Sequence, residues 1–200
     1  MGKTTLFNSL TGLSAVTANY PGVTVERRVG KMICQGETVN LIDLPGAYSL
    51  SARSPDEMIV ADVLLGQQKG EDPVDVILAV VDASNLERNL YLVTQLFELG
   101  KPVVIALNMC DVAERRGVSI DSEKLAERLG VPVVPVCAHK RIGESQLREV
   151  LARTVQDTSR VPQPLVRFPE TLDVAVDKLH LELLVHADLL GRKVSRFEAF

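Results

Sequence analysis

The strongest indication of the fold is the stretch Gly2-Lys3-Thr4-Thr5-Leu6-Phe7-Asn8-Ser9-Leu10-Thr11-Gly12. It predicts a helix from Thr4 to Leu10, with Gly12 just past its end. A Gly-Lys-Thr sequence at a helix start is typical of phosphate-binding loops, because backbone N–H groups then open the helix beside the anion. Lys3 would add a point charge for the β- and γ-phosphates and Thr4 a hydroxyl for Mg²⁺, with Gly2 and Thr5 in the same nucleotide-binding segment.

A second segment, Asp43-Leu44-Pro45-Gly46, follows the apolar stretch Thr38-Val39-Asn40-Leu41-Ile42. A strand at that stretch aims the carboxylate of Asp43 at the water shell of the metal ion. The backbone amide of Gly46 must approach the γ-phosphate, and a Cβ at that position would crowd the approach. We therefore predict Asp43 as a metal-site residue and Gly46, together with Lys3, as a catalytic residue.

Two later segments, Asn108-Met109-Cys110-Asp111 and Cys137-Ala138-His139-Lys140, are candidates for reading the base. A carboxylate accepts from both the ring N–H and the exocyclic amine of guanine, a pair of donors that adenine does not present. Asp111 is therefore the predicted specificity residue, with Asn108 beside it. Each of the four segments occurs often by chance, but all four in this order predict a guanine-nucleotide site.

The composition fits such a domain. The 200 residues are 46% hydrophobic, which is enough for one core with a small appendage. A formal net charge of −4 argues against a nucleic-acid partner, and the pair Arg27-Arg28 is expected on a solvated face. Cys34, Cys110 and Cys137 are far apart and in no ligand spacing, so we expect neither a disulfide nor a zinc site. The longest apolar run, at 76–81, is too short to cross a bilayer and no signal peptide is visible, which predicts a soluble chain in the cytosol.

Helix-like and strand-like segments alternate along the chain, which predicts an α/β fold with a mainly parallel sheet and helices on both faces. Strands are expected at 29–34, 39–42, 74–81, 103–107 and 131–136, the first two as a hairpin around 35–37. Helices are expected at 55–65 behind the capping box Ser54-Pro55-Asp56-Glu57, at 86–99 capped by Asn85, at 121–129 ended by Gly130, and at 144–155. The predicted ligand-contacting residues then lie at strand ends or in the loops after them, where open α/β sheets bind ligands.

The composition changes beyond residue 154. Three prolines at 162, 164 and 169 mark a linker in which a helix cannot run continuously. A helix is expected at 171–190 with Gly191 as its stop, and a second helix from Val194 is cut off at Phe200. We therefore divide the chain into a nucleotide-binding domain at 1–156, a linker at 157–170 and the start of a truncated helical domain at 171–200.

Three segments are specific enough to compare with a known family: Gly2–Gly12, Asn19-Tyr20-Pro21-Gly22-Val23-Thr24-Val25-Glu26 and Asp43-Leu44-Pro45-Gly46-Ala47-Tyr48-Ser49-Leu50. They closely resemble the cytosolic G domain of FeoB-type ferrous iron transporters, over roughly residues 2–150 and more loosely the tail. The segment at 108–111 supports the resemblance, because this family commonly carries methionine where most GTPases have lysine. Met109 keeps an apolar stem against the base plane without the charge. The fold that the resemblance implies is the Ras-like P-loop GTPase sheet.

The resemblance also implies a site and a reaction. Thr24 becomes the first-switch threonine that closes on Mg²⁺, Met109 and Cys137 join the base site, and Ala138 offers a backbone N–H to the base oxygen. The reaction is hydrolysis of GTP to GDP and phosphate by Mg²⁺-assisted in-line displacement. Slow turnover is expected, because Ala47 stands where Ras-like enzymes place a water-orienting glutamine. The family resemblance adds K⁺ assistance through a phosphate-loop asparagine, which this chain lacks.

The resemblance further implies that a helical regulatory domain and a membrane permease domain follow in the intact protein. The chain would then regulate Fe²⁺ uptake at the cytoplasmic face of the plasma membrane. The first half of the phosphate loop and the first strand are missing ahead of Gly2, so we expect either a fragment or a start that was assigned late. A homo-oligomer is left open.

Two alternatives remain from the sequence. One is a soluble regulatory GTPase of the ribosome- or tRNA-associated kind, and the other is a nucleotide-binding module that does not turn over. The side chains of His180, Glu182 and His186 do not share one helix face, so we expect surface residues there rather than metal ligands.

Overall fold

The structure is a computed structural model, and it describes residues 2–21, 23–34, 36–51, 54–68, 70, 72–165, 168–186, 194 and 198. Its described strands form two three-stranded sheets. The first is antiparallel, in the order β1 (Ala15–Asn19), β2 (Glu26–Cys34) and β3 (Glu37–Asp43). The second is parallel, in the order β4 (Ile77–Asp82), β5 (Val103–Asn108) and β6 (Val133–Pro135).

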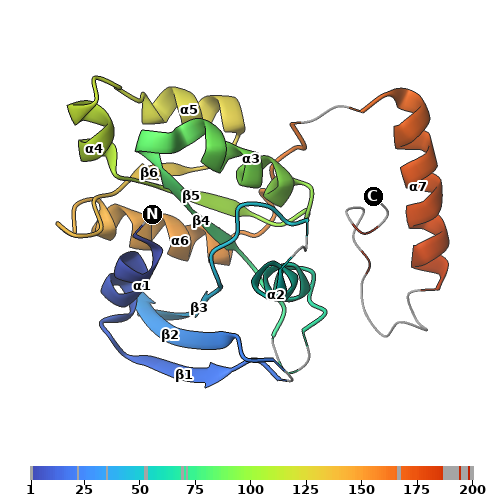
Figure 1. The fold of residues 1–200 in the computed structure, drawn as a ribbon, viewed down its shortest axis with the longest axis horizontal. Helices are drawn as coiled ribbons and strands as arrows, with labels where there is room; N and C mark the ends of the chain where they lie inside the picture. The colour runs from blue at the N-terminus through green and yellow to red at the C-terminus, as the bar shows by residue number, and fades with distance from the viewer. Residues whose placement is uncertain are drawn as a thin grey trace.

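The two sheets follow one another from β1 at the bottom of the view in Figure 1 to β6 near its top, with β3 and β4 as the neighbouring edges. Within the described residues β3 pairs only with β2, and β4 pairs only with β5. Each of these two strands therefore has one edge without a strand partner in the described part of the chain, and its backbone groups lack the usual ladder on that side.

The helices surround the sheets (Figure 1). Their bounds are α1 (Lys3–Thr11), α2 (Pro55–Leu64), α3 (Leu86–Phe97), α4 (Cys110–Arg115), α5 (Ser122–Leu129), α6 (Glu144–Gln156) and α7 (Glu170–Val185), with a 3₁₀ turn, η1, at Ala83–Asn85. None of the helices in the described residues is long and apolar enough to cross a membrane.

The core is organised around β5, which is buried along its whole length. Its side chains alternate between two hydrophobic clusters, as successive residues of a strand point to opposite faces. Ile105 packs in the cluster that contains Phe97 of α3, whereas Val104 packs in the cluster that contains Leu6 of α1 and Leu147 of α6. Helices therefore cover both faces of the parallel sheet, as the sequence predicts.

A polar contact joins α1 to α6. The Ser9 hydroxyl donates to Oε2 of Glu144 at 2.6 Å, and Arg148 donates to the Ser9 carbonyl oxygen and to Oε1 of Glu144, each at 2.8 Å. Burial raises the pKa of Glu144, but the hydrogen bonds from Ser9 and Arg148 and the arginine charge outweigh it, so the pKa lies below its usual range.

Most predicted elements are confirmed by the structure. The hairpin is present as β2 and β3, the Oγ of Ser54 accepts from the Glu57 N–H at 3.2 Å, and α5 ends at Gly130 in the left-handed conformation. Asp121 caps α5, since its side chain accepts from the Lys124 N–H.

Five details differ from the sequence prediction. β1 and α4 have no predicted counterpart, and β1 makes half of the described strands antiparallel. Asn85 is the N-cap residue of α3, but its side chain accepts no capping hydrogen bond. The cap lies three residues earlier, where the side chain of Asp82 accepts from the Ser84 N–H at 2.9 Å at the start of η1. The strand predicted at 131–136 is reduced to the three residues of β6, and the helix predicted to reach 190 ends at Val185.

Other predictions fall on residues outside the described part: the hairpin turn at Gln35, Gly22 in the family segment, the helix stop at Gly191, and the helix from Val194, of which only residues 194 and 198 are described. α7 lies apart from both sheets in Figure 1, and a ring nitrogen of His180 lies 3.1 Å from the Val194 carbonyl oxygen.

Candidate nucleotide-binding site

The first turn of α1 and the end of β3 meet at one point. Nζ of Lys3 lies 2.9 Å from Oδ1 of Asp43, and the Asp43 side chain is only 8% exposed. The carboxylate is therefore held against the lysine within the protein rather than in water. The structure thus brings together the lysine predicted for the phosphates and the carboxylate predicted for the metal ion.

Arg28 of β2 is a second cation at the same carboxylate. It pairs with Asp43 across the ladder, and its Nη1 lies 3.8 Å from Oδ2 of Asp43. Its Nη2 donates to Oδ1 of Asn8 at 3.3 Å, and the guanidinium lies 5.4 Å from the ring centre of Phe7. The expectation of a solvated face is therefore wrong for Arg28. The one signal in the sequence was the predicted hairpin, whose register continues from β2 toward Asp43.

Gly2 lies where the segment predicted for the phosphates comes close to the segment predicted for the base. It is the N-cap residue of α1 with φ of 74°, a conformation that favours glycine. A Cβ at Gly2 would lie 2.6 Å from Nδ2 of Asn108, so a side chain would collide with that amide. Thr4 and Thr5 follow in the first turn of α1, and both are exposed.

Asn108 ends β5 and is 1% exposed. Its Oδ1 accepts from the Ala138 N–H at 3.2 Å, which fixes the loop after β6 beside the end of β5. That loop is closed by an antiparallel bridge between Cys137 and Ile142. In this structure the Ala138 N–H, which the family resemblance assigns to the base oxygen, is therefore bound to Asn108.

Asp111 in α4 presents the two oxygens of its carboxylate differently. Oδ1 is buried and has no hydrogen-bond partner, whereas Oδ2 lies 3.6 Å from Arg115, 3.9 Å from Lys140 and 4.0 Å from His139. A buried acceptor without a donor carries a desolvation cost that an incoming donor would remove. The carboxylate borders an open depression of about 660 Å³ that also includes Glu114.

The residues between Asn108 and Asp111 make a strained turn. Met109 has φ of 62° and ψ of 27°, a left-handed conformation that is uncommon for a residue with a side chain and that starts α4 directly after β5. Cys110 donates its thiol to the Leu107 carbonyl oxygen at 3.4 Å. Burial, and then the charges of Glu114 and Asp111, raise the pKa of Cys110, so this thiol stays protonated at neutral pH.

Thr24 lies in the loop between β1 and β2 and is exposed. The loop is held on α2 by the buried side chains of Tyr20 and Val25, which pack against Ile59 and Val63. Thr24 is four residues from Arg28 along the chain, a span of up to about 13 Å in extended backbone. The role that the family resemblance assigns to Thr24 stays a prediction.

Gly46 is exposed, and a Cβ there would meet no atom within 4 Å. The packing of the protein therefore leaves the space in front of this glycine open to an incoming group. The segment that follows is attached to α3, because the Leu50 N–H donates to Oε1 of Gln95 at 2.9 Å. Arg88 adds a cation–π contact, 4.1 Å from the ring centre of Tyr48.

The donors predicted for Mg²⁺ suit that ion chemically. The hydroxyls of Thr4 and Thr24 and the carboxylate of Asp43 are hard oxygen ligands. Asp43 already faces the ammonium group of Lys3, so its position in the fold suits a cation.

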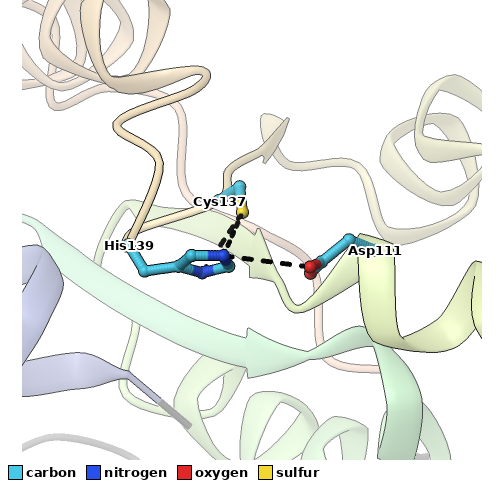
Figure 2. Close-up of side chains that lie close together, drawn as sticks. All are labelled: Asp111, Cys137 and His139. Atoms are coloured by element: carbon cyan, nitrogen blue, oxygen red, sulfur yellow. Dashed lines mark hydrogen bonds and ion pairs between the residues drawn. The ribbon is translucent and has the colours of Figure 1, made fainter.

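A further cluster involves the base end of the site. Cys34, Cys110 and Cys137 are all free, and Figure 2 shows the sulfur of Cys137 directed at the ring of His139, which a further dashed line joins to Asp111. One ligand atom of each of these three residues lies within 4.8 Å of the others. The wide spacing of the cysteines in the sequence gave no sign of this, because an aspartate and a histidine complete the group.

The fold is an α/β domain in which the start of α1, predicted for the phosphates, lies beside the end of β5, after which Asp111, predicted for the base, follows in α4. A family model described as "Ferrous iron transport protein B" (FeoB_N) matches residues 1–151. The chain belongs to this family, which confirms the resemblance.

Curated relatives agree with the family. The Fe(2+) transporter FeoB of Legionella pneumophila (strain Lens) is 49% identical over 159 residues, which cover 78% of this chain and 20% of the relative. The Fe(2+) transporter FeoB of Salmonella typhimurium (strain LT2) is 47% identical over 179 residues, which cover 86% of this chain and 22% of the relative. The chain thus spans about a fifth of the length of these relatives.

Solved structures agree with the fold. The cytosolic domain of L. pneumophila FeoB matches with a TM-score of 0.83 and 42% identity, over 99% of this chain and 73% of that one. The cytosolic domain of the T. maritima FeoB iron transporter in its GMPPNP form matches with a TM-score of 0.82 and 35% identity, over 99% and 75%. The predicted fold class is therefore confirmed.

Proposed function

We propose that this chain binds GTP and GDP and hydrolyses GTP slowly, as the cytosolic switch domain of a ferrous iron transporter. One observation carries the proposal: a Cβ on Gly2 would lie 2.6 Å from Nδ2 of Asn108, so the segments predicted for the phosphates and for the base are neighbours in space. Lys3 is the first residue of α1 after Gly2, and Asp111, with its unpartnered Oδ1, follows Asn108 by three positions.

The relatives support a nucleotide site in this position. The T. maritima domain was solved in GMPPNP and GDP forms, and an S. thermophilus domain that is 42% identical was solved with GDP. Those ligands belong to the relatives, and we extend them to this chain because the phosphate and base segments are present in it.

The residues of the chain would act in sequence. Phosphates that bind at the start of α1 meet its free N–H groups and draw the ammonium of Lys3 away from Asp43. Arg28 stays beside Asp43, so the carboxylate keeps one positively charged partner. The loop that carries Thr24 then closes over the γ-phosphate, and the Gly46 N–H approaches it through the open space in front of that residue. Mg²⁺, held by Thr4, Thr24 and Asp43, would neutralise phosphate charge when bound.

Turnover should be slow because Ala47 has no group that can orient the attacking water. Its methyl group is buried and cannot hydrogen-bond. Intrinsic hydrolysis without an oriented water is on the order of 10⁻³ s⁻¹ or a little above. The same feature favours the second candidate, a nucleotide-binding module that does not turn over. Assistance by K⁺ stays a prediction from the family resemblance.

Thr4→Ala tests the proposal, with Thr171→Ala as its matched control. Both threonines are exposed second residues of a helix, in α1 and α7 respectively, so neither change should affect folding. We expect Thr4→Ala to weaken Mg²⁺-dependent binding of fluorescent GTP by about tenfold or more, equivalent to about 1.4 kcal/mol, and Thr171→Ala to leave it unchanged.

Three outcomes would count against the proposal. Equal GTP affinity in the two variants and the wild type would remove α1 from the site. Binding without phosphate release in single-turnover measurements would favour the module without turnover. Hydrolysis at several per second, without K⁺ or a partner, would contradict the slow mechanism.

We also propose that the chain works with a membrane permease domain of the same parent chain, where it regulates Fe²⁺ uptake from the cytoplasmic face. The relatives that carry the name Fe(2+) transporter are about five times as long as the matched region. The division into 1–156, 157–170 and 171–200 belongs to this proposal. Reading the gene beyond Phe200 tests it, because a soluble regulatory GTPase would have no membrane-spanning segments there.

A further inference from the structure

The cluster of Asp111, Cys137 and His139 has the composition of a transition-metal site. Sγ of Cys137 lies 3.4 Å from Nδ1 and 3.8 Å from Nε2 of His139, and Nε2 lies 4.0 Å from Oδ2 of Asp111. Thiolate, imidazole and carboxylate are the three kinds of ligand that proteins use for Zn²⁺. Figure 2 shows the three side chains converging from α4 and from the loop after β6.

The distances are close to those that a metal ion requires. Zinc–sulfur bonds of about 2.3 Å and zinc–nitrogen bonds of about 2.0 Å place sulfur and nitrogen about 3.6 Å apart at a tetrahedral centre. The 3.8 Å between Sγ of Cys137 and Nε2 of His139 is close to this length, but Sγ lies nearer to Nδ1, at 3.4 Å, so the imidazole ring must turn to direct Nε2 at an ion beside the sulfur. The 4.0 Å between Nε2 and the Asp111 carboxylate must shorten by less than about 1 Å, which an exposed histidine in a turn can accommodate.

The charges around the cluster are compatible with a divalent cation. A thiolate and a carboxylate together balance its two positive charges, and the proton of Cys137 leaves to solvent as the metal–sulfur bond forms. Arg115 and Lys140 lie 3.6 and 3.9 Å from Oδ2 of Asp111, but both side chains are mostly exposed and can turn into water. The depression of about 660 Å³ beside Asp111 and His139 gives an ion a path from solvent.

We propose that Asp111, Cys137 and His139 bind a divalent transition-metal ion of the Zn²⁺ or Fe²⁺ kind, and that this ion and a guanine base exclude one another. Guanine needs both oxygens of the Asp111 carboxylate for its two donors, so a metal ion on one oxygen leaves a guanine donor unpaired. The metal ion would thus lower the affinity for guanine nucleotides. The exclusion rests on the proposed function, whereas the metal site does not.

Cobalt is the probe for the site itself. Co²⁺ bound by a thiolate gives a charge-transfer band in the near ultraviolet, and a tetrahedral centre adds intense visible bands. We expect these bands when Co²⁺ is added to the 200-residue chain without nucleotide, and their loss when Zn²⁺ is added. Cys137→Ser should abolish the thiolate band, and His139→Asn should weaken Co²⁺ binding by more than about tenfold, the loss caused even by removing an outer-shell partner.

Matched controls lie elsewhere in the chain. Cys110→Ser removes a neighbouring thiol that donates to Leu107 and is not in the cluster, and His186→Asn removes an exposed histidine at the end of α7. Both variants should bind Co²⁺ like the wild type. A missing thiolate band in the wild type, or a band that depends on Cys110 rather than Cys137, would overturn the metal site.

The exclusion is tested with GDP against ADP, because the two nucleotides carry the same phosphates. GDP should remove the cobalt bands and ADP should not, since adenine lacks the donor pair that Asp111 accepts. Equal loss with ADP would mean that phosphates simply chelate the metal, and persistence of the bands with saturating GDP would mean that both ligands bind together. Either result would overturn the exclusion.

Two further arms separate the ions and the hypotheses. Fe²⁺, added in the absence of oxygen in place of Zn²⁺, shows by loss of the cobalt bands whether iron binds at the site. If Zn²⁺ displaces Co²⁺ and Fe²⁺ does not, the site is selective for zinc. In His139→Asn we expect GDP affinity to stay within about threefold while Zn²⁺ no longer weakens it. If the chain shows the Cys137-dependent bands but binds no GDP, the metal site stands and the proposed function fails.

Discussion

Replacing Asp111 by Asn should move the base preference of the site from guanine to xanthine. The carboxylate offers two acceptors, and its buried Oδ1 has no hydrogen-bond partner among the residues that the structure describes. Guanine presents a ring N–H and an exocyclic amine side by side, whereas xanthine has a carbonyl oxygen in place of the amine. The amide of Asn offers one acceptor and one donor, which pair with xanthine and leave one guanine donor facing another donor.

The magnitude follows from the surroundings of Asp111. A lost charge-assisted hydrogen bond costs about 1.5–3 kcal/mol, so GDP affinity should fall roughly 10- to 150-fold. The ion pairs of Oδ2 are also lost, but their partners Arg115, His139 and Lys140 are 73%, 54% and 54% exposed. Such exposed pairs contribute about 0–1 kcal/mol, so the melting temperature should change little.

The assay is a pair of titrations with fluorescent GDP and xanthosine diphosphate, run beside a thermal melt of each protein. We expect wild type to prefer GDP, and Asp111→Asn to prefer xanthosine diphosphate at an unchanged melting temperature. Unchanged GDP affinity in the variant would refute the assignment of Asp111 to the base. Loss of GDP without any gain of xanthosine diphosphate, in a protein that melts normally, would refute the geometry of the two donors.

Three further predictions follow from particular contacts. Gly2→Ala should lower the stability of the protein by about 1–2 kcal/mol because of the positive φ at this position, and should also weaken GDP binding because the new Cβ displaces the amide of Asn108. The control is Gly66→Ala, where φ is 71° and the new Cβ meets no atom within 4 Å. In thermal melts and GDP titrations the control should lose stability but keep its GDP affinity. Glu144→Gln should flatten the acid side of the stability curve measured by urea unfolding. The pKa of Glu144 is lowered in the folded state, so its contribution is complete above about pH 5 and is lost as the pH falls through the folded-state pKa; an equally steep loss in the variant would contradict this. A version extended upstream by about fifteen residues, the length of a strand and a loop, should have a higher melting temperature and bind GDP more tightly if that strand pairs with the open edges of β3 and β4. Equal melting temperatures and GDP affinities in the two versions would mean that no added strand pairs with these edges.

The sequence predicts best the elements whose signals are local. The capping box before α2 is made within four residues, and its Ser54–Glu57 contact is present as predicted. The stop of α5 at Gly130 and the buried strand β5 also depend on short patterns of residue type. The family resemblance depends on short runs of residue types, at 2–12, 19–26 and 43–50, which can be recognised without knowing the packing around them.

The sequence predicts least well the contacts between distant segments. Arg28 gives no local sign that it lies against Asp43, since only the hairpin register brings them together. β1 was missed because its residues are mostly exposed and lack the apolar alternation of a half-buried strand. α4 was missed because a left-handed residue, Met109, separates it from β5 by a single position, and residue type alone does not predict that conformation.

Asn108 shows how the two ends of the site depend on one another. It is 1% exposed, so its amide interacts with the protein on all sides even without a nucleotide. Its Oδ1 binds the Ala138 N–H, and its Nδ2 occupies the space that a Cβ on Gly2 would need. A base oxygen that accepts from the Ala138 N–H must compete with Oδ1 of Asn108 for that donor. Any rotation of the Asn108 amide also changes the space beside Gly2 at the start of α1. We therefore expect Asn108 to act as a positioning residue between the loop after β6 and the start of α1, while Oδ1 of Asp111 is the acceptor that we predict to distinguish guanine.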